Sequence, residues 1–466
     1  MTLARACSVL GLLVLAALLA GCTSQDGGTP SPTASPTSSV FVLDHATPSS
    51  TATREPVVET VELTHTAWLI DLASGDVHTI HEDPDAVIWR AEWSGDTARI
   101  YSNLASEGVA FTRDGDEAEV APVPHACEQV DDHVVIDGVE YPEIGHCYLF
   151  SPSGRYVPYS VDADEYQDPR GLTLPRWDQW ILDLETGGRT MVQAGLVHCG
   201  GCDAMFGMSW SPDERYLVVA DLAAEERVFL VDLERGTSRV VAHGGQHHER
   251  PAWSPNVPGR LLVRSEDGDA LLIDDAAGTE EVLPLAWPAR FDVSGRYAYS
   301  PSGLVPDRRS SDRMPDDRPR TTTVYDIDAR EVVAEIEGIP VWSLWSWSDV
   351  AAVVATETGF VAAVDGRACR GTVLYTTGDP ERCLEGAYHA VPSPDGTQLA
   401  VSIPRGPVAM VNGGSMVRYD IGLYDIATDT TRVVAEGALS GGAPPRLRWN
   451  DTADALLVAW PTYEGV

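Results

Sequence analysis

The chain contains no lysine, so all 32 of its basic residues are arginines, and they face 70 acidic residues. The resulting formal net charge of −38 offers no basic footprint for the phosphate backbone of a nucleic acid. The same charge opposes docking of the domain surface on anionic lipid. We therefore expect no nucleic-acid partner, and no membrane contact through the surface of the folded domain.

Long apolar runs and the common catalytic motifs are also lacking. The apolar run from Val9 to Ala20 is shorter than the roughly 20 residues that a membrane-spanning helix needs. There is no Gly-x-Ser-x-Gly elbow, no P-loop, no Gly-x-Gly-x-x-Gly and no His-Glu-x-x-His. These absences predict a protein without a membrane span and without catalytic activity.

The short apolar run belongs to a segment that directs export. Residues 1–21 have the basic start and apolar middle of a signal peptide. They end in Leu19-Ala20-Gly21-Cys22, which resembles the lipobox of bacterial lipoproteins. The resemblance implies cleavage before Cys22 and acylation of that residue, which anchors the protein on the extracytoplasmic face of the cell membrane. An ordinary signal peptide with a chance cysteine is the alternative.

The next segment, residues 22–55, is dominated by serine, threonine and proline. Such a composition cannot bury enough apolar surface to offset the entropy of ordering, so we interpret it as a flexible tether. Val40-Phe-Val-Leu43 interrupts it and could add a strand to the folded part. Residues 56–466 are expected to form the domain.

Six cysteines remain beyond the signal segment and the lipid site. An even number in an exported chain indicates disulfides, and six cysteines allow 15 connectivities. Their clustering favours local pairs, each closing one loop or hairpin: Cys127 with Cys147, Cys199 with Cys202, and Cys369 with Cys383.

One short pattern recurs eight times at spacings between 38 and 60 residues. It consists of an aromatic or similar residue, a tight polar turn and a short apolar strand. A period of this size indicates stacked or radial repeats. The instances are Trp93-Ser-Gly-Asp, Phe150-Ser-Pro-Ser-Gly, Trp210-Ser-Pro-Asp, Trp253-Ser-Pro-Asn, Phe291-Asp-Val-Ser-Gly, Trp347-Ser-Asp, Pro392-Ser-Pro-Asp-Gly and Trp449-Asn-Asp.

Each repeat predicts four short strands joined by hairpin turns. In the third repeat, strands are expected at 206–210, 216–220, 227–232 and 237–242. The chain ends with two strands of a repeat, at 447–449 and 455–460, and begins, after the tether, with two more at 67–71 and 77–80. Paired together, these ends would complete one repeat and close a ring. We predict an all-β propeller of eight four-stranded blades, with seven as the alternative.

The Ser-Pro-Asp-Gly turns, each followed by an apolar strand and an apolar-Asp-apolar-x-x-Gly hairpin, resemble the TolB-type (WD-repeat-like) β-propeller family. The resemblance extends over roughly residues 60–462. It implies a β-propeller fold. Two departures, the lack of room for an N-terminal α/β domain and the incomplete turns at Trp347 and Trp449, mean that the translocation role of TolB is not carried over.

Histidines gather in the segments that cross from one predicted blade to the next. They are His125, His133, His146, His198, His243, His247, His248 and His389. Within His198-Cys-Gly-Gly-Cys202 and His243-Gly-Gly-Gln-His-His-Glu249, the spacing suits zinc or copper. A small disulfide loop and ordinary polar loops are the alternative, and we prefer it, so no cofactor is predicted.

These observations predict a lipid-anchored, extracytoplasmic propeller that acts as a binding or assembly scaffold with a protein or glycan partner. Two alternatives stay open. One is a metal-binding propeller, as an enzyme or otherwise, which would use His198, His243, His247 and His248. The other is a carbohydrate-binding module, for which the cluster of Trp342, Trp345 and Trp347 offers stacking surfaces.

Overall fold

The structure is a computed structural model, and the residues it describes contain strands and turns but no α-helix. No helix among these residues is long and apolar enough to cross a membrane. The described residues are 40–41, 65–83, 88–94, 96–102, 109–118, 127–130, 133–142, 151–167, 171, 173–197, 208–221, 227–243, 251–302, 321–338, 352–366, 369–405, 410–411, 414–441 and 444–460.

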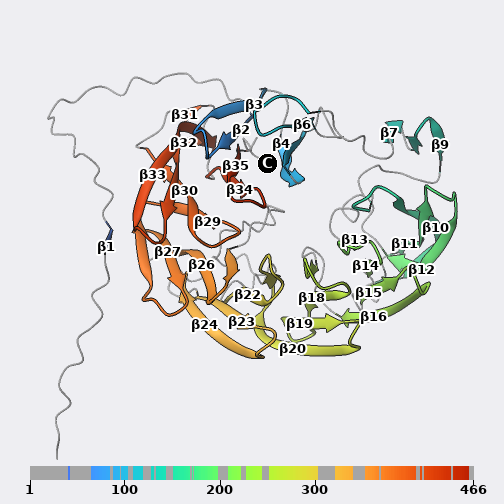
Figure 1. The fold of residues 1–466 in the computed structure, drawn as a ribbon. Coiled ribbons are helices and arrows are strands. Elements are labelled where there is room, and N and C mark those ends of the chain that lie inside the picture. Colours follow the sequence, from blue (N-terminus) through green and yellow to red (C-terminus); the bar gives the residue numbers. More distant parts are fainter. Residues whose placement is uncertain are drawn as a thin grey trace, which may run out of the picture. The chain divides into compact units, whose positions relative to one another are not determined.

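The strands form nine sheets that follow one another along the chain (Figure 1). The terminal sheet combines both ends of the chain: β2 (His65–Asp71), β3 (Val77–Asp83), β34 (Arg446–Trp449) and β35 (Ala455–Trp460). Two three-stranded sheets come next: β4 (Ile88–Ser94), β5 (Thr97–Ser102) and β6 (Val109–Phe111), then β7 (Cys127–Val130), β8 (His133–Ile136) and β9 (Val139–Tyr141).

The middle of the chain forms four sheets. Their strands are β10 (Tyr156–Gln167), β11 (Thr173–Asp183) and β12 (Arg189–Val197); β13 (Met208–Trp210), β14 (Tyr216–Asp221), β15 (Arg227–Asp232) and β16 (Thr237–His243); β17 (Ala252–Trp253), β18 (Arg260–Arg264), β19 (Asp269–Asp274) and β20 (Thr279–Ala286); and β21 (Arg290–Phe291), β22 (Tyr297–Ser302), β23 (Thr321–Asp326) and β24 (Glu331–Glu337).

Two five-stranded sheets complete the described part. The first holds β25 (Val353–Thr356), β26 (Gly359–Gly366), β27 (Gly371–Thr376), β28 (Arg382–Glu385) and, added at its edge, β1 (Val40–Phe41). The second holds β29 (Tyr388–Pro392), β30 (Gln398–Pro404), β31 (Met410–Val411), β32 (Gly414–Asp425) and β33 (Thr430–Gly441).

Six of the nine sheets formed by the described residues contain one of the eight sequence motifs in a described strand. Six motif residues lie in the first strand of a sheet: Trp93, Trp210, Trp253, Phe291, Pro392 and Trp449. Phe150 and Trp347 fall outside the described residues, directly before β10 and β25 in the chain. The β7–β9 sheet has no motif of its own, which is why the repeat pattern did not predict it.

The motif recurs because the residue after the aromatic closes the turn with a buried polar group. Ser211 is fully buried, and its hydroxyl accepts a 2.9 Å hydrogen bond from the Tyr216 N–H. Asp292 does the same with its carboxylate for Tyr297 at 2.8 Å, and Asn450 with its amide oxygen for Ala455 at 3.0 Å. Serine, aspartate and asparagine are interchangeable here because each supplies an acceptor for one main-chain donor.

We expect Ser393→Ala to lower the free energy of unfolding by about 1–2 kcal/mol, because the partly buried Gln398 N–H loses the acceptor that the buried Ser393 side chain supplies. The Ser393 side chain accepts from the Gln398 N–H at 3.0 Å and donates to Asp395 at 2.6 Å. Denaturant unfolding measures the change. Thr397→Ala in the same turn is the control, since Thr397 is exposed and its hydroxyl contacts only Asp395 among the described partners; an equal loss from both variants would contradict the prediction.

Arginine–aspartate pairs secure the same end of four consecutive sheets. In the three four-stranded sheets, each arginine lies at or just before the start of the second strand and each aspartate ends the third strand. In the β10–β12 sheet, Arg155 precedes β10 and Asp183 ends β11. The pairs are Arg155–Asp183 at 2.8 Å, Arg215–Asp232 at 2.9 Å, Arg260–Asp274 at 2.9 Å and Arg296–Asp326 at 2.8 Å.

Three of these arginines also stack on the tyrosine that follows them, as Arg215 does on Tyr216 at 5.0 Å from the ring centroid. A planar guanidinium can form a forked ion pair and stack on an aromatic ring at once, which an ammonium group cannot. This repeated contact therefore requires arginine, the only basic side chain other than histidine that the sequence contains.

In the terminal sheet the arginine of this pair is replaced by a carboxylate. Asp454 precedes the second strand β35, and Asp71 ends the third strand β2. Arg113, from the turn after β6 in the next sheet, supplies the missing cation: it lies 2.6 Å from Asp71 and 2.6 Å from Asp454. We call these three residues the Arg113 clasp, because they join the N-terminal strand, the C-terminal strand and the neighbouring sheet.

Apolar clusters join each sheet to the next in chain order. Phe229 of β15 packs with Ile181 of β11, and Leu374 of β27 packs with Leu399 of β30. The clusters run without a break from the β7–β9 sheet through the terminal sheet to the β4–β6 sheet. Successive antiparallel meanders packed face to face are the blade arrangement of a β-propeller.

The pairing of the chain ends is present as predicted. β2 pairs antiparallel with β35 from Thr66 opposite Trp460 to Asp71 opposite Ala455. The strand expected near Val40 is present too, as β1. A closed ring, however, also requires contact between the β4–β6 sheet and the β7–β9 or β10–β12 sheet, and no apolar cluster of described residues joins them. Ring closure and blade number therefore stay predictions.

Candidate functional site

The two ends of the sheets differ in a way that locates the candidate site. At the turn end, where first strands meet second strands and third meet fourth, short turns repeat the contacts described above. At the connector end, where second strands lead to third strands and one sheet leads to the next, the connections differ from sheet to sheet. Binding residues usually lie on variable loops supported by a rigid framework, so the connector end is the candidate functional site.

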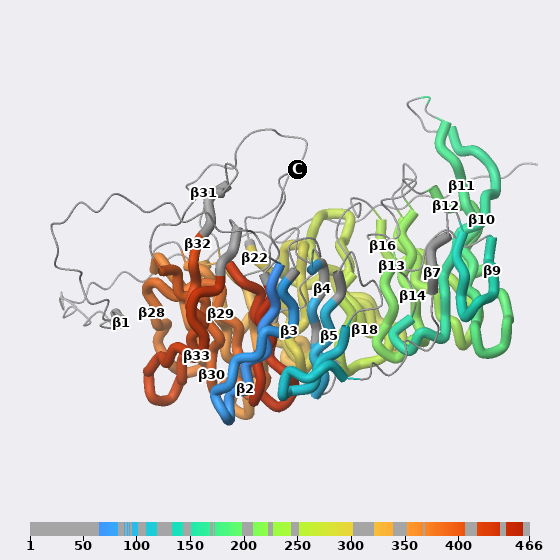
Figure 2. Tube along the Cα trace, turned by 90° about the horizontal axis from the view of Figure 1, so that it is seen from above, coloured from blue at the N-terminus to red at the C-terminus, as the bar shows by residue number. Residues whose placement is uncertain are grey.

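One described projection at the connector end is the β10–β11 arm, the outer parts of β10 and β11 that lie between Val161 and Arg176. Figure 2 shows these strands extending past β13 and β14. Much of the arm is exposed, including Asp162, Asp164 and Glu165. Arg176 lies 5.1 Å from the ring centroid of Tyr166 and 3.9 Å from Asp164, so its guanidinium contacts other residues of the arm.

A histidine and a carboxylate meet at the connector end where two sheets adjoin. Asp365 is the penultimate residue of β26, and His389 is the second residue of β29 in the next sheet. The Asp365 carboxylate accepts a 3.2 Å hydrogen bond from the His389 main-chain N–H. The Nε2 atom of His389 is 3.8 Å from the other carboxylate oxygen, which is too long for a hydrogen bond.

The surroundings shift the pKa values of this pair in opposite directions. Burial raises the pKa of Asp365 to about 6, although the hydrogen bond from the His389 main-chain N–H lowers it. Burial lowers the pKa of His389 to about 4, so its imidazole is neutral at neutral pH. The imidazole is 31% exposed and can therefore exchange hydrogen bonds with a bound molecule. The arrangement offers polar recognition, and Asp365 can take up a proton near pH 6.

The pair predicts opposing pH effects on stability. Between pH 4 and 6 the folded Asp365 holds a proton that the unfolded chain has lost. The contribution of Asp365 to the free energy of unfolding therefore falls as pH rises. From pH 4 to 6.5, His389 is protonated more fully in the unfolded chain than in the folded chain. The contribution of His389 to the free energy of unfolding therefore rises with pH.

We therefore expect the free energy of unfolding of His389→Gln to fall by about 1 kcal/mol relative to that of the wild type as pH rises from 4 to 6. The free energy of unfolding of Asp365→Asn should rise relative to that of the wild type over the same pH range. Urea unfolding at several pH values measures both, and the two variants control for each other. Curves for both that stay parallel to the wild type would contradict the prediction.

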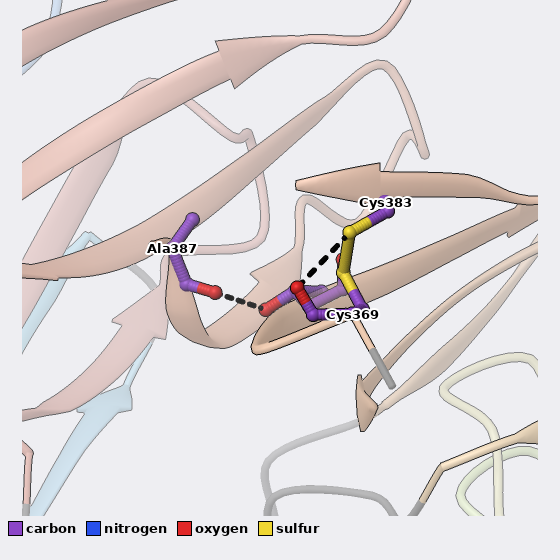
Figure 3. Close-up of a disulfide and its surroundings, with 4 residues drawn as sticks. Cys369, Cys383 and Ala387 are labelled. Carbon is purple, nitrogen blue, oxygen red and sulfur yellow. Dashed lines mark hydrogen bonds between the residues drawn. A yellow bond between two sulfur atoms is a disulfide. The ribbon is translucent and has the colours of Figure 1, made fainter. Parts of the chain in front are cut away.

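A disulfide lies in the same sheet as Asp365. Cys369 precedes β27 and Cys383 lies in β28, with Cα atoms 5.5 Å apart (Figure 3). The Thr372 hydroxyl donates a 3.0 Å hydrogen bond to the carbonyl of Ala387, which ties the disulfide corner to the segment leading to His389. Gly371 is required here, because a Cβ atom would lie 2.2 Å from the Leu384 carbonyl oxygen.

The structure tests some of the predicted site residues. The disulfide between Cys369 and Cys383 is confirmed. Cys127 lies in β7, while its expected partner Cys147 is outside the described residues. Also outside are Cys22, Cys199, Cys202, His198, His247, His248 and the cluster at Trp342, Trp345 and Trp347.

The predicted histidine group is reduced to one described member, His243, which is the exposed last residue of β16. No group of three or more potential metal ligands occurs among the described residues. His133, His243 and His389 were expected in connectors, and that was wrong, because all three lie in strands: His133 begins β8, His243 ends β16 and His389 is the second residue of β29. In β8 the strand forms because Val134 and Ile136 alternate into the core with 0% and 2% exposure.

The Asp365–His389 contact was missed from the sequence. His389 was noted among the histidines of the connectors, but Asp365 was not. The available signal was an apolar strand that ends in Asp-Gly, as Val364-Asp365-Gly366 does. That signal identifies a strand end, and the partner depends on which sheets adjoin.

Comparison with known proteins adds little to this description. No protein-family model and no curated protein sequence matches the chain. Among solved structures, a putative TolB from Agrobacterium tumefaciens is 13% identical, with 86% of this chain and 100% of that chain covered and a TM-score of 0.27. The tricorn protease is 11% identical, with 84% and 43% covered and a TM-score of 0.33. Because these TM-scores are low, the assignment of the fold depends on the strand pairing described above.

Proposed function

We propose that the protein is a non-catalytic binding or assembly scaffold, held on the extracytoplasmic face of the cell membrane by a lipid on Cys22. The observation that carries this proposal is the contrast between the two ends of the sheets. Repeated ion pairs and buried turn residues secure one end. The other end presents the β10–β11 arm, the Asp365–His389 pair and connections that differ from sheet to sheet. A rigid framework with one variable end is suited to recognising a partner.

In this proposal the eight motif-bearing sheets are the eight blades of a closed propeller, rather than seven. The terminal sheet is the closing blade, because β2 and β35 pair across the chain ends. In this proposal the β7–β9 sheet is an insertion, because it lacks the motif that the eight blades share.

The partner in this proposal is a protein or a glycan that binds at the connector end. The strongly negative chain favours partners with exposed cations. To test this, the purified protein is immobilised through its turn end and exposed to a glycan array and to extracytoplasmic proteins from the source cell. Binding that is unchanged by replacement of connector-end residues such as His389 and Tyr166 would contradict the proposal.

The membrane part of the proposal predicts that Cys22→Ala releases the protein from membranes. The wild type should sediment with membranes and partition into detergent, because acylation of Cys22 supplies the anchor. Fractionation of cells that express each form measures the distribution. A neighbouring change, Ser24→Ala, is the control and should leave the protein on the membrane; membrane retention of Cys22→Ala would contradict the anchor.

Elemental analysis tests the alternative in which the histidine-rich connectors bind a metal. The protein should be purified without an affinity metal tag. Near-stoichiometric zinc or copper, lost on replacement of His247 and His248, would favour that alternative over the scaffold.

A further inference from the structure

Strand β1 lies far from the rest of its sheet in the sequence. Its residues Val40 and Phe41 pair in parallel with Cys383 and Leu384 of β28. Every other strand pairing of the described residues is antiparallel and belongs to a meander or to the paired chain ends. β1 is therefore a strand added to the edge of a completed four-stranded sheet.

The β28 edge differs from the last strands of neighbouring sheets. β28 has four residues, whereas β24 has seven and β33 has twelve. The disulfide joins Cys383 of β28 to Cys369, which precedes β27, and Leu384 of β28 is buried at 3% exposure. A fixed edge strand with free main-chain groups is a template for an added strand.

Because β1 occupies the β28 edge in the structure, we propose that this edge is a strand-addition site that holds the chain's own segment at Val40 and Phe41 and thereby sets where the tether leaves the folded domain. The contact moves the point at which the tether leaves the folded domain. Without it, the tether would join the domain at His65, where β2 begins in the terminal sheet. With it, the tether leaves from the β25–β28 sheet. The consequence for the membrane rests on the proposed anchor at Cys22, but the strand addition does not.

This contact would shorten the distance over which the domain can move from its anchor. At about 3.3–3.6 Å per residue, the chain from Cys22 to Val40 reaches at most about 60 Å, whereas the chain from Cys22 to His65 reaches about 150 Å. The added strand would also fix which sheet faces the membrane. An extended apolar peptide that competed for the β28 edge would release the longer tether.

Hydrogen exchange measured by mass spectrometry on the full chain in detergent tests the proposal. Phe41→Pro removes a main-chain donor and fixes φ, which disfavours the added strand. We expect the amides of β28 to exchange at least threefold faster in Phe41→Pro than in the wild type. Thr51→Pro, elsewhere in the tether, is the matched control and should exchange as the wild type does.

Two further measurements sharpen the outcome. A synthetic peptide of residues 36–46 added to the Phe41→Pro chain should restore slow exchange, and the same peptide with proline at position 41 should not. The whole set should give the same result in a Cys22→Ala background, so failure of the lipid anchor is distinguishable from failure of the strand addition. Equal β28 exchange in the wild type and Phe41→Pro, with the disulfide intact, would overturn the proposal.

Discussion

Replacing Cys369 and Cys383 together with alanine should lower the free energy of unfolding by about 3 kcal/mol. The disulfide joins residues separated by 14 positions, and opening a loop of that size returns conformational entropy to the unfolded chain. The corner also has little freedom to adapt, since the Gly371 backbone is packed against the Leu384 carbonyl. We expect β28 to loosen first and the Asp365–His389 contact with it.

Thermal and urea unfolding of the double variant measure this loss. The double substitution is preferable to a reducing agent, which would also reach any disulfides at Cys127, Cys147, Cys199 and Cys202. Asp379→Ala is the control, because Asp379 lies in the same loop, is 58% exposed and pairs with Arg382 only at 3.9 Å. A loss below about 1 kcal/mol in the double variant would mean that the loop stays closed without its disulfide.

The repeat pattern was enough to predict the all-β architecture. Each motif places an acceptor such as Ser211 or Asn450 in a tight turn, and that local contact fixes the hairpin that follows. Spacing alone predicted the pairing of Cys369 with Cys383, because the two cysteines flank one hairpin. Counting the strands left over at each end predicted the pairing of β2 with β35.

Features that depend on contacts between sheets were not predictable in this way. The β7–β9 sheet lacks the motif, so no repeat indicated it. Asp365 meets His389 because two neighbouring sheets adjoin at their connector ends. Arg113 compensates for an arginine missing from a sheet that it does not belong to. The repeat pattern of the sequence predicts contacts within one repeat. Each of these three features instead depends on which sheet lies next to another.

The Arg113 clasp gives the second large effect. Arg113→Ala should lower the free energy of unfolding by about 2 kcal/mol at neutral pH, between the values typical of exposed and buried ion pairs. The substitution leaves Asp71 and Asp454 facing each other without their cation, across the junction of the N-terminal and C-terminal strands. The same arginine also donates to the Asp454 main-chain carbonyl at 3.0 Å.

The loss should depend on pH in a definite direction. The hydrogen bond from Arg113 is the largest of the contacts that hold the pKa of Asp71 down at about 2. A lowered pKa contributes stability above pH 4, and that contribution disappears as pH falls towards 2. The difference between wild type and Arg113→Ala should therefore shrink over this range in urea unfolding. Arg235→Ala is the control, since Arg235 is 61% exposed and no closer than 3.5 Å to its acidic partners. If the Arg113→Ala difference is as small as that of the control, or constant from pH 7 to 2, packing between the sheets holds the chain ends together without the clasp.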